Sequence, residues 1–312
     1  MSLPQLSGGL FVTDGGLETD LIFNRGIDLP AFAAFVLLDD PVGMRALLDY
    51  YEGFQSIARD HGAGLILDTP TWRANRDWGE RLGYDKSRLA DANKRWAEIV
   101  AQIRDGWAGE GAAVVLDGMI GPRGDGYVPD KQMSADEAAD YHAEQIGTFA
   151  ETDVDMVTVL TMNYAEEAVG VALAAQAHGL PAVISFTVET DGRLPTGQAL
   201  REAIDRVDSD TGAAPAYYMV NCAHPTHFEH VLTGEGGWRE RIRGIRANAS
   251  TMSHAELDEA EELDAGDPAD LAGGYVRLGE RLPNLCVLGG CCGTDRRHVA
   301  AVMEQFSGND PI

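Results

Sequence analysis

The sequence is poor in basic residues. Its 312 residues include 24 Lys and Arg against 50 Asp and Glu, which gives a formal net charge of -26. Proteins that bind nucleic acid or an anionic membrane surface use Lys and Arg to neutralise phosphate. The charge balance therefore argues against both kinds of partner. The densest acidic stretch, residues 254–267, is predicted to form a solvated helix or loop face.

Long hydrophobic runs are also missing. No apolar stretch has the length needed to cross a bilayer, and the start of the chain, MSLPQLSGGLFVTDGG, lacks a basic segment followed by an apolar one. We therefore expect a cytoplasmic protein. Hydrophobic residues still make up 45% of the chain, enough to bury a large core in one domain over residues 1–312.

Cysteine is scarce, and its distribution is uneven. The four cysteines are Cys222, Cys286, Cys291 and Cys292, so two of them are adjacent. Disulfides are rare in a reducing cytoplasm, where clustered cysteines more often bind metal or take part in catalysis.

The chain is rich in short apolar segments that alternate with segments of helical periodicity. The predicted strands are 10–13, 64–69, 113–118, 155–160, 182–187, 217–222, 242–249 and 285–290. The predicted helices are 42–61, 87–107, 135–151, 165–178, 198–207, 225–232, 268–282 and 296–306. Buried strands separated by amphipathic helices indicate parallel pairing, and eight such units close a (β/α)8 TIM barrel.

Local signals agree with this assignment. Ser134 and Glu137 form a capping-box pattern, Asp267 precedes Pro268 at a helix start, and Gly179 follows a helix end. The competing architecture is an open doubly wound sheet, which usually carries a glycine-rich phosphate loop after its first strand. The segment here is DGGLETD, which matches neither that loop nor a P-loop. The TIM barrel is therefore the predicted fold.

Three cysteines are predicted to meet at one rim of this barrel. Cys222 ends the sixth strand, while Cys291 and Cys292 follow the eighth, and the C-terminal strand ends carry the chemistry of such barrels. Three thiolates with an open fourth position are typical of a catalytic zinc site. A vicinal disulfide or three unrelated buried thiols are the alternatives. Cys286 lies within the eighth strand and is predicted to be a small core residue.

The motifs GGCCGT (289–294), VNC (220–222) and TDGGLETDL (13–21) together resemble the homocysteine S-methyltransferase family over nearly the whole chain. That family comprises zinc-dependent barrels, including the betaine- and S-methylmethionine-using enzymes. The resemblance implies that Cys222, Cys291 and Cys292 hold Zn²⁺. It also implies that Asp14, the aspartate of the DGG motif, helps to hold the amino group of homocysteine.

Further substrate contacts are expected at the same rim. Gly15 lets backbone approach a ligand closely, and Thr69 lies at the end of the second strand, where the resemblance places a threonine. Asn221 precedes the zinc cysteine, although it could instead satisfy backbone groups. A cationic methyl donor needs aromatic faces, and the candidates on the strand-end loops are Trp72, Trp78, Tyr127 and Tyr164. Packing at the rim is the alternative for each of these rings.

One position departs from the family pattern. After the fourth strand the family usually has a glutamate that binds the substrate amino group, and this chain has Leu160 there, followed by Thr161. Glu166 and Glu167 are expected to lie too far along the next helix to replace it. Either Glu189 or Asp191 could recruit a cation instead, or be a plain loop residue. A thiol other than homocysteine is therefore an open alternative.

The histidines of CAHPTHFEH present a spacing that could mimic a metal motif, but Pro225 separates the first pair. We expect His227 and His230 to lie on a helix surface and His224 to lie near the zinc ligands.

The predicted activity is zinc-dependent transfer of a methyl group from a sulfonium or quaternary ammonium donor to a small-molecule thiol. No catalytic side chain is expected beyond the zinc-activated substrate thiol. Two alternatives are a zinc barrel that uses metal-bound water for hydrolysis or cleavage, and a protein with structural zinc. Three anionic sulfurs would weaken the metal as a Lewis acid, which argues against the first, and an open ligand position argues against the second.

Overall fold

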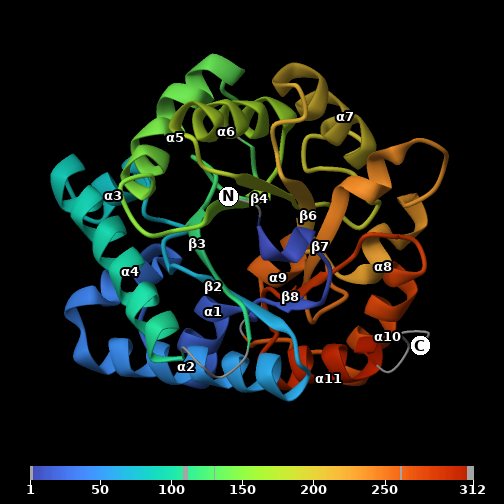
Figure 1. Cartoon of the computed structure of the whole chain (residues 1–312), viewed down its shortest axis with the longest axis horizontal. Helices are drawn as coiled ribbons and strands as arrows, with labels where there is room; N and C mark the ends of the chain where they lie inside the picture. Colours follow the sequence, from blue (N-terminus) through green and yellow to red (C-terminus); the bar gives the residue numbers. More distant parts are fainter. Residues whose placement is uncertain (1–2, 108–111, 130, 261, 308–312) are drawn as a thin grey trace.

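The computed structural model describes residues 3–107, 112–129, 131–260 and 262–307. Within them, eight parallel strands form a closed barrel in the order β1 to β8, and helices surround it (Figure 1). The predicted (β/α)8 barrel is confirmed. The strands are β1 Phe11–Val12, β2 Gly64–Asp68, β3 Val114–Ile120, β4 Met156–Met162, β5 Ala182–Phe186, β6 Tyr217–Asn221, β7 Ile242–Ala247 and β8 Val287–Gly290.

The α-helices of the described chain vary widely in length. They are α1 Leu17–Thr19, α2 Pro41–Asp60, α3 Arg76–Arg81, α4 Lys86–Gly106, α5 Ala135–Phe149, α6 Ala165–His178, α7 Leu200–Thr211, α8 Pro225–Phe228, α9 His254–Asp258, α10 Pro268–Gly279 and α11 Arg296–Ser307. The predicted end signals are confirmed: Ser134 and Glu137 form a capping box on α5, Asp267 caps α10, and Gly179 ends α6 in the left-handed conformation.

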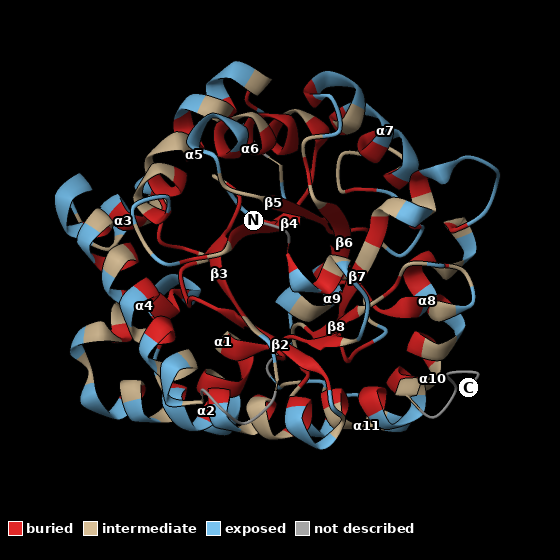
Figure 2. Cartoon of the chain, viewed as in Figure 1, coloured by how far each residue is buried: buried red, intermediate tan, exposed pale blue. Residues whose placement is uncertain are grey.

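Two layers of core hold the barrel together. Apolar side chains from seven of the eight strands, among them Phe11, Ile66 and Tyr217, form one buried cluster that also contains Leu3. Because these residues come from strands all around the barrel, the cluster fills its interior, and the N-terminus lies over the barrel in Figure 1. The larger cluster packs the outer strand faces against the helices, whose inward sides are buried and outward sides exposed (Figure 2).

The structure differs from the sequence prediction mainly in the loops. The predicted helix 225–232 is a single turn, α8, followed by a 3-10 turn at Glu229–Val231. Short helices follow β1, β2 and β7: α1 with a π-helical turn at Asp20–Asn24, then α3, and α9. The first two were not predicted, and α9 lies within the stretch 254–267 predicted as a helix or loop face. Each of these loops extends from the C-terminal end of a strand, and all three contribute to the cavity described below.

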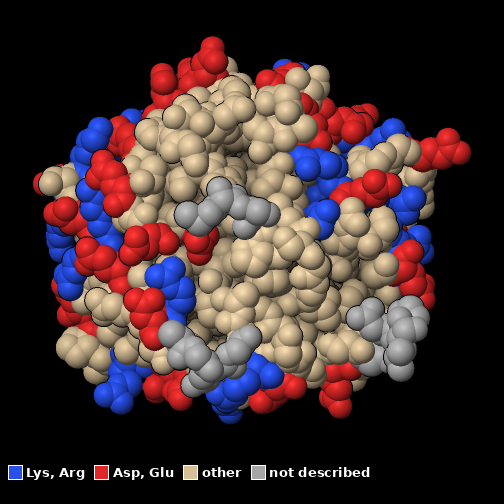
Figure 3. All heavy atoms as spheres, in the orientation of Figure 1, with Lys and Arg blue, Asp and Glu red and all other residues tan. Residues whose placement is uncertain are grey.

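The described residues include no helix long and apolar enough to cross a membrane. Charged side chains lie mainly around the periphery of the face seen in Figure 3, and its centre is largely uncharged.

Candidate metal centre and substrate cavity

Three sulfur atoms converge at the C-terminal ends of β6 and β8. The Sγ atoms of Cys222, Cys291 and Cys292 all lie within 4.8 Å of one another, close enough to share one metal ion. Cys222 is buried, and the other two are partly exposed toward the cavity. In the described chain no fourth His, Cys, Asp or Glu joins the group, so one tetrahedral position would remain open. Cys286 lies outside the group and donates from its thiol to the Gln5 carbonyl at 3.4 Å.

The Cys222 and Cys291 sulfurs are in bonding contact as a disulfide, with their Cα atoms 5.4 Å apart. No disulfide was expected, because a reducing compartment was predicted. The disulfide kept as an alternative joined the adjacent Cys291 and Cys292, so the observed pairing differs from it. Thiols that converge on one ion are also close enough to oxidise. The same two sulfurs cannot be bonded to each other and both be thiolate ligands, so the disulfide and the metal site are alternative states.

Backbone conformation brings the cysteines together. Cys222 has a φ of 54°, in the left-handed region that a side chain rarely adopts, and its N–H donates to the Arg246 carbonyl. After β8, Gly293 has a φ of 78°, which turns the chain directly behind Cys292. The loop after β1 packs against this turn: a Cβ on Gly16 would lie 2.5 Å from the Cys291 carbonyl oxygen. Residues 15–16 after β1 and the turn at 291–293 after β8 therefore pack closely against each other.

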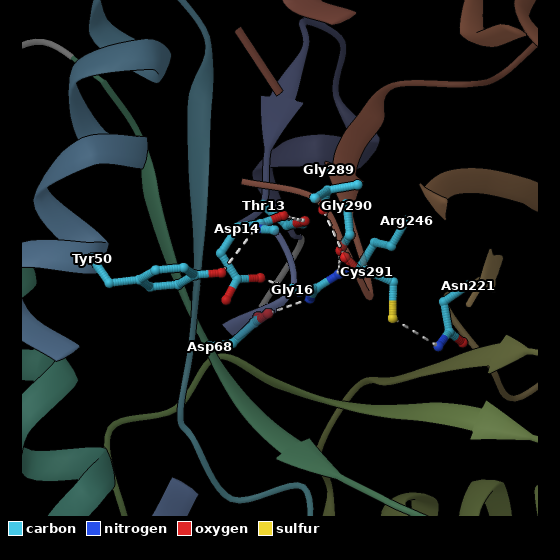
Figure 4. A network of polar contacts seen from close by, with 12 residues as sticks. Thr13, Asp14, Gly16, Tyr50, Asp68, Asn221, Arg246, Gly289, Gly290 and Cys291 are labelled. Carbon is cyan, nitrogen blue, oxygen red and sulfur yellow. Dashed lines mark hydrogen bonds and ion pairs between the residues drawn. The ribbon is translucent and has the colours of Figure 1, made fainter. Parts of the chain in front are cut away.

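A buried arginine forms an ion pair with Asp14, the carboxylate that the resemblance assigned to the amino group of homocysteine. The Arg246 guanidinium, at the end of β7, pairs through Nη2 with Asp14 and through Nη1 with Asp68, and its Nε donates to the Gly290 carbonyl at 3.2 Å (Figure 4). Burial raises the pKa of Asp14 to about 7, against the opposing effect of Arg246. Every nitrogen of Arg246 has an acceptor, so this cluster already satisfies the Asp14 charge without a ligand.

A cavity of about 610 Å³ opens beside the three sulfurs. It is lined by Asp14, Gly15, Thr69 and Trp72 of the predicted contacts, and also by Trp78 and Tyr127. Tyr164 does not line it, because its hydroxyl accepts from the Met133 N–H, which is the rim-packing alternative. Gly15 approaches the Thr294 backbone, where a Cβ would lie 2.9 Å from the carbonyl oxygen.

The two polar contacts predicted near the strand ends are largely used within the protein. Thr69 Oγ1 accepts from the Met119 N–H at 2.9 Å. The Asn221 side-chain oxygen accepts from the Thr161 N–H and the Ser185 hydroxyl, and its amide donates to the Thr161 hydroxyl. Asn221 does not line the cavity. Its oxygen satisfies one backbone group, the Thr161 N–H, and its amide also donates to the Cys291 Sγ atom at 4.0 Å (Figure 4).

Leu160 lies where β4 is irregular. The β4–β5 register shifts between Val159 and Met162, and Thr161 has a φ of 64°. The Leu160 side chain lines the cavity, so an apolar group stands there. Glu167 cannot replace a carboxylate at this point, because it is buried on α6 and accepts from the Arg123 N–H and bonds to His142.

A second layer of contacts surrounds the sulfurs. His254 bonds through Nε2 to the Cys222 carbonyl at 2.6 Å and through Nδ1 to Glu189 at 3.1 Å, which engages one of the two carboxylates considered as cation binders. The Tyr127 ring lies 4.2 Å from His254, and its hydroxyl hydrogen-bonds to Cys292. The segment 254–267 is therefore more than a solvated face, since residues from both of its ends line the cavity.

Burial raises the pKa of Cys292 to about 11; the charge of Glu18 adds to this rise, and the Tyr127 hydrogen bond opposes it. Without a metal, Cys292 is therefore a thiol at neutral pH. Metal binding would require loss of that proton, as it does in other thiolate sites.

The histidines after β6 take no part in the sulfur cluster. His224 caps α8 through Thr226, and His227 is buried and bonds to the Thr251 carbonyl, so the prediction of a surface position is wrong for His227. His230 is exposed, as predicted.

Sequence reasoning missed four side chains that shape the cavity: Glu18, Asp68, Arg73 and Arg246. Arg246 had a usable signal, since a charge inside a strand predicted to be buried requires a partner. Glu18 lies within the recognised TDGGLETDL motif but was given no role there. Asp68 ends β2 and Arg73 follows it, and neither belongs to a recognised motif.

Comparison with known proteins decides the family. The sequence profile described as "Homocysteine S-methyltransferase" matches residues 11–306. The chain belongs to the homocysteine S-methyltransferase family. The match covers the DGG segment of the β1 loop and all three cysteines, which agrees with the resemblance seen in the sequence.

Solved structures agree on the fold of this family member. The homocysteine methyltransferase MmuM from Escherichia coli superposes in its metallated form with a TM-score of 0.73 and 18% identity, covering 96% of each chain. Its oxidized form gives 0.73 and 19%, covering 95% of this chain and 96% of that one. Its apo form superposes with a TM-score of 0.68 and 18% identity, covering 97% of this chain and 98% of that one. A search of the curated proteins finds no significant match.

Proposed function

We propose that this family member is a zinc-dependent thiol S-methyltransferase that moves a methyl group from a sulfonium or quaternary ammonium donor to a small thiol such as homocysteine. The single observation that carries the proposal is the convergence of the Cys222, Cys291 and Cys292 sulfurs beside a cavity. Family membership supports the methyl transfer. The metallated form of MmuM supports a metal in this family.

The donor set fits zinc. Three soft sulfur donors without a described oxygen ligand suit Zn²⁺ and disfavour Mg²⁺ or Ca²⁺. Zinc held by these three residues would bind the acceptor sulfur at an open position and keep it deprotonated at neutral pH. The site requires reduced Cys222 and Cys291, so the activity should depend on a reductant.

The protein's own residues would position the two substrates. The Arg246 cluster fixes the Gly290 carbonyl directly before Cys291, and His254 fixes the Cys222 carbonyl. Tyr127 lines the cavity and offers an aromatic ring to a methylated cation, whereas the Trp72 and Trp78 rings are already in contact with the Arg73 guanidinium. The acceptor sulfur attacks the methyl carbon, the bond from that carbon to the donor heteroatom breaks, and its electron pair stays with the neutral leaving group. Alignment of the three atoms is the main contribution.

Glu18 is proposed to hold the ammonium group of homocysteine. It lines the cavity, affects the pKa of Cys292, and makes no ion pair with a Lys, Arg or His in the described ranges. Asp14 is engaged by Arg246, and Leu160 offers no charge.

The cytoplasmic location stays a prediction.

The experiment compares single cysteine variants under a reductant. Zinc per chain and methylation of homocysteine are measured with S-methylmethionine, betaine, S-adenosylmethionine and dimethylsulfonio compounds as donors. Wild type and Cys286→Ala should bind about one zinc and methylate the thiol with at least one donor. Cys222→Ala and Cys292→Ala should lose both properties. Full activity in a zinc-free preparation would reject the proposal.

A further inference from the structure

A second buried arginine, Arg73, lines the cavity. It follows β2 and is 8% exposed. Its guanidinium carbon lies 4.1 Å from the Trp72 ring centroid and 3.7 Å from that of Trp78. Two indole rings therefore hold the guanidinium, which limits its freedom before any ligand arrives.

The Arg73 guanidinium makes no ion pair in the described chain, and the Asp125 and Glu18 carboxylates raise its pKa only from beyond ion-pair distance. Its hydrogen bond in the described chain is from Nη1 to the Gly124 carbonyl at 3.1 Å, its Nε is buried without a partner, and no described carboxylate lies within ion-pair distance. Burial lowers the pKa of Arg73 to about 10, which still leaves it charged at neutral pH. Arg246, the other buried arginine of the cavity, has an acceptor for every nitrogen. A buried charge without a partner is unfavourable, and an anion from a ligand would relieve that cost.

The position of Arg73 assigns that anion to one substrate. The acceptor sulfur must reach the cysteines at the ends of β6 and β8, which flank β7, and β2 stands three strands from β7 in the closed order of eight. In an in-line displacement the leaving group departs on the side of the methyl carbon away from the attacking sulfur. The part of the donor that remains after transfer therefore points away from the cysteines, toward Arg73.

We propose that Arg73 is the specificity-determining residue for the methyl donor and binds a carboxylate on the donor's leaving portion. This inference rests on the proposed function and deepens it, since it makes the donor a zwitterion with an onium centre and an anionic end. The acceptor sulfur forms a bond to the methyl carbon, and the carbon–sulfonium bond breaks. The electron pair passes to the leaving sulfur, which becomes a neutral thioether whose carboxylate stays on Arg73. A carboxylate matches the paired donors of a guanidinium.

The test uses two donors that differ in one charge: dimethylsulfonioacetate and its methyl ester. Wild type, Arg73→Met and Arg73→Lys are compared under saturating homocysteine. Arg81→Met is the matched control, because Arg81 also lies over Trp78, at 4.4 Å, but is exposed and outside the cavity. Wild type and the control should prefer the acid over the ester by about a hundredfold in kcat/KM.

In Arg73→Met that preference should disappear, through a higher KM for the acid, while turnover of the ester and the KM for homocysteine stay unchanged. Arg73→Lys should keep part of the preference, because it retains the charge without the planar fork. Equal loss with acid and ester, or a raised KM for homocysteine instead, would overturn the donor assignment.

Calorimetric titration of the zinc-loaded protein with dimethylsulfonioacetate separates this inference from the proposed function. Binding to wild type at least about tenfold tighter than to Arg73→Met supports the Arg73 site even if neither donor transfers a methyl group. Equal binding, or no binding to wild type, rejects it. Absence of methyl transfer in wild type counts only against the proposed function.

Discussion

At the scale of single residues, the cavity holds charges whose surroundings differ. Asp14 and Asp68 are both engaged by Arg246, whereas Glu18 and Arg73 have no ion pair within the described segments. Burial raises the pKa of Glu18, and the nearby Arg246 and Arg73 oppose that rise. Glu18 and Arg73 are therefore available to a substrate, and they have opposite signs.

Glu18→Gln tests the role assigned to the free carboxylate. If Glu18 holds an ammonium group, the variant should raise the KM for homocysteine by roughly tenfold, the value of one charged hydrogen bond. The KM for 4-mercaptobutanoate, which has the same thiol and carboxylate without the amino group, should not change. Steady-state kinetics with a fixed donor gives both values. An equal rise for the two thiols would mean that Glu18 acts on the site in another way.

The site residues that were predicted and those that were missed differ in whether the local sequence indicates their role. Cys222, Cys291 and Cys292 could be predicted because each stands at the end of an apolar segment whose place in the barrel follows from counting strands. The ion pairs of Arg246 join residues 232 and 178 positions apart, and no local pattern encodes such a partner. Side-chain pairing across the barrel becomes visible only when the strands have closed.

At the scale of elements, the strands were more predictable than the loops. Each strand is a short buried run, and burial on both faces leaves an apolar signature. The helix predicted at 225–232 fails after one turn: Phe228 leaves the helical region with a φ of -133°, and a 3-10 turn follows. The acidic residues around α9 suggested a solvated face, and its contribution to the cavity depends on His254, whose partners lie on other elements.

The start of α11 gives an element-scale prediction. Asp295 accepts from the Arg297 N–H at 2.8 Å and bonds to His298. Burial opposes ionisation of Asp295, but these hydrogen bonds outweigh it and hold the pKa of the carboxyl well below its usual range. A lowered pKa in the folded state means that Asp295 stabilises the protein above about pH 4 and loses that effect as pH falls.

Asp295→Asn should therefore reduce the free energy of unfolding by about 1–2 kcal/mol at pH 6. The difference from wild type should shrink toward pH 3. Urea unfolding at the two pH values measures it. Asp136→Asn, at an exposed position in the first turn of α5, is the control and should change stability by less than about 0.5 kcal/mol. A difference that grows on acidification would contradict the argument.

At the scale of the whole molecule, the barrel closes along a narrow seam. β1 has only two residues, and it pairs with β8 through Phe11 and Val12. The Arg246 side chain reinforces this region, because it joins the end of β7 to Asp14 after β1, Asp68 on β2 and the Gly290 carbonyl of β8 (Figure 4). One side chain thus links four strands beside the candidate metal centre.

Arg246→Met should reduce the free energy of unfolding by about 3–5 kcal/mol, because it leaves two buried carboxylates without their cation. Urea unfolding under a reductant and without metal isolates this effect from zinc binding. Arg201→Met removes an exposed arginine paired with Asp205 on α7 and should cost less than about 1 kcal/mol. Arg246→Lys keeps the charge but cannot reach three acceptors in one plane, so it should lie between wild type and Arg246→Met. If Arg246→Met were as stable as Arg201→Met, backbone pairing and core packing alone would hold the seam. Arg246 would then shape the site without adding to the free energy of unfolding.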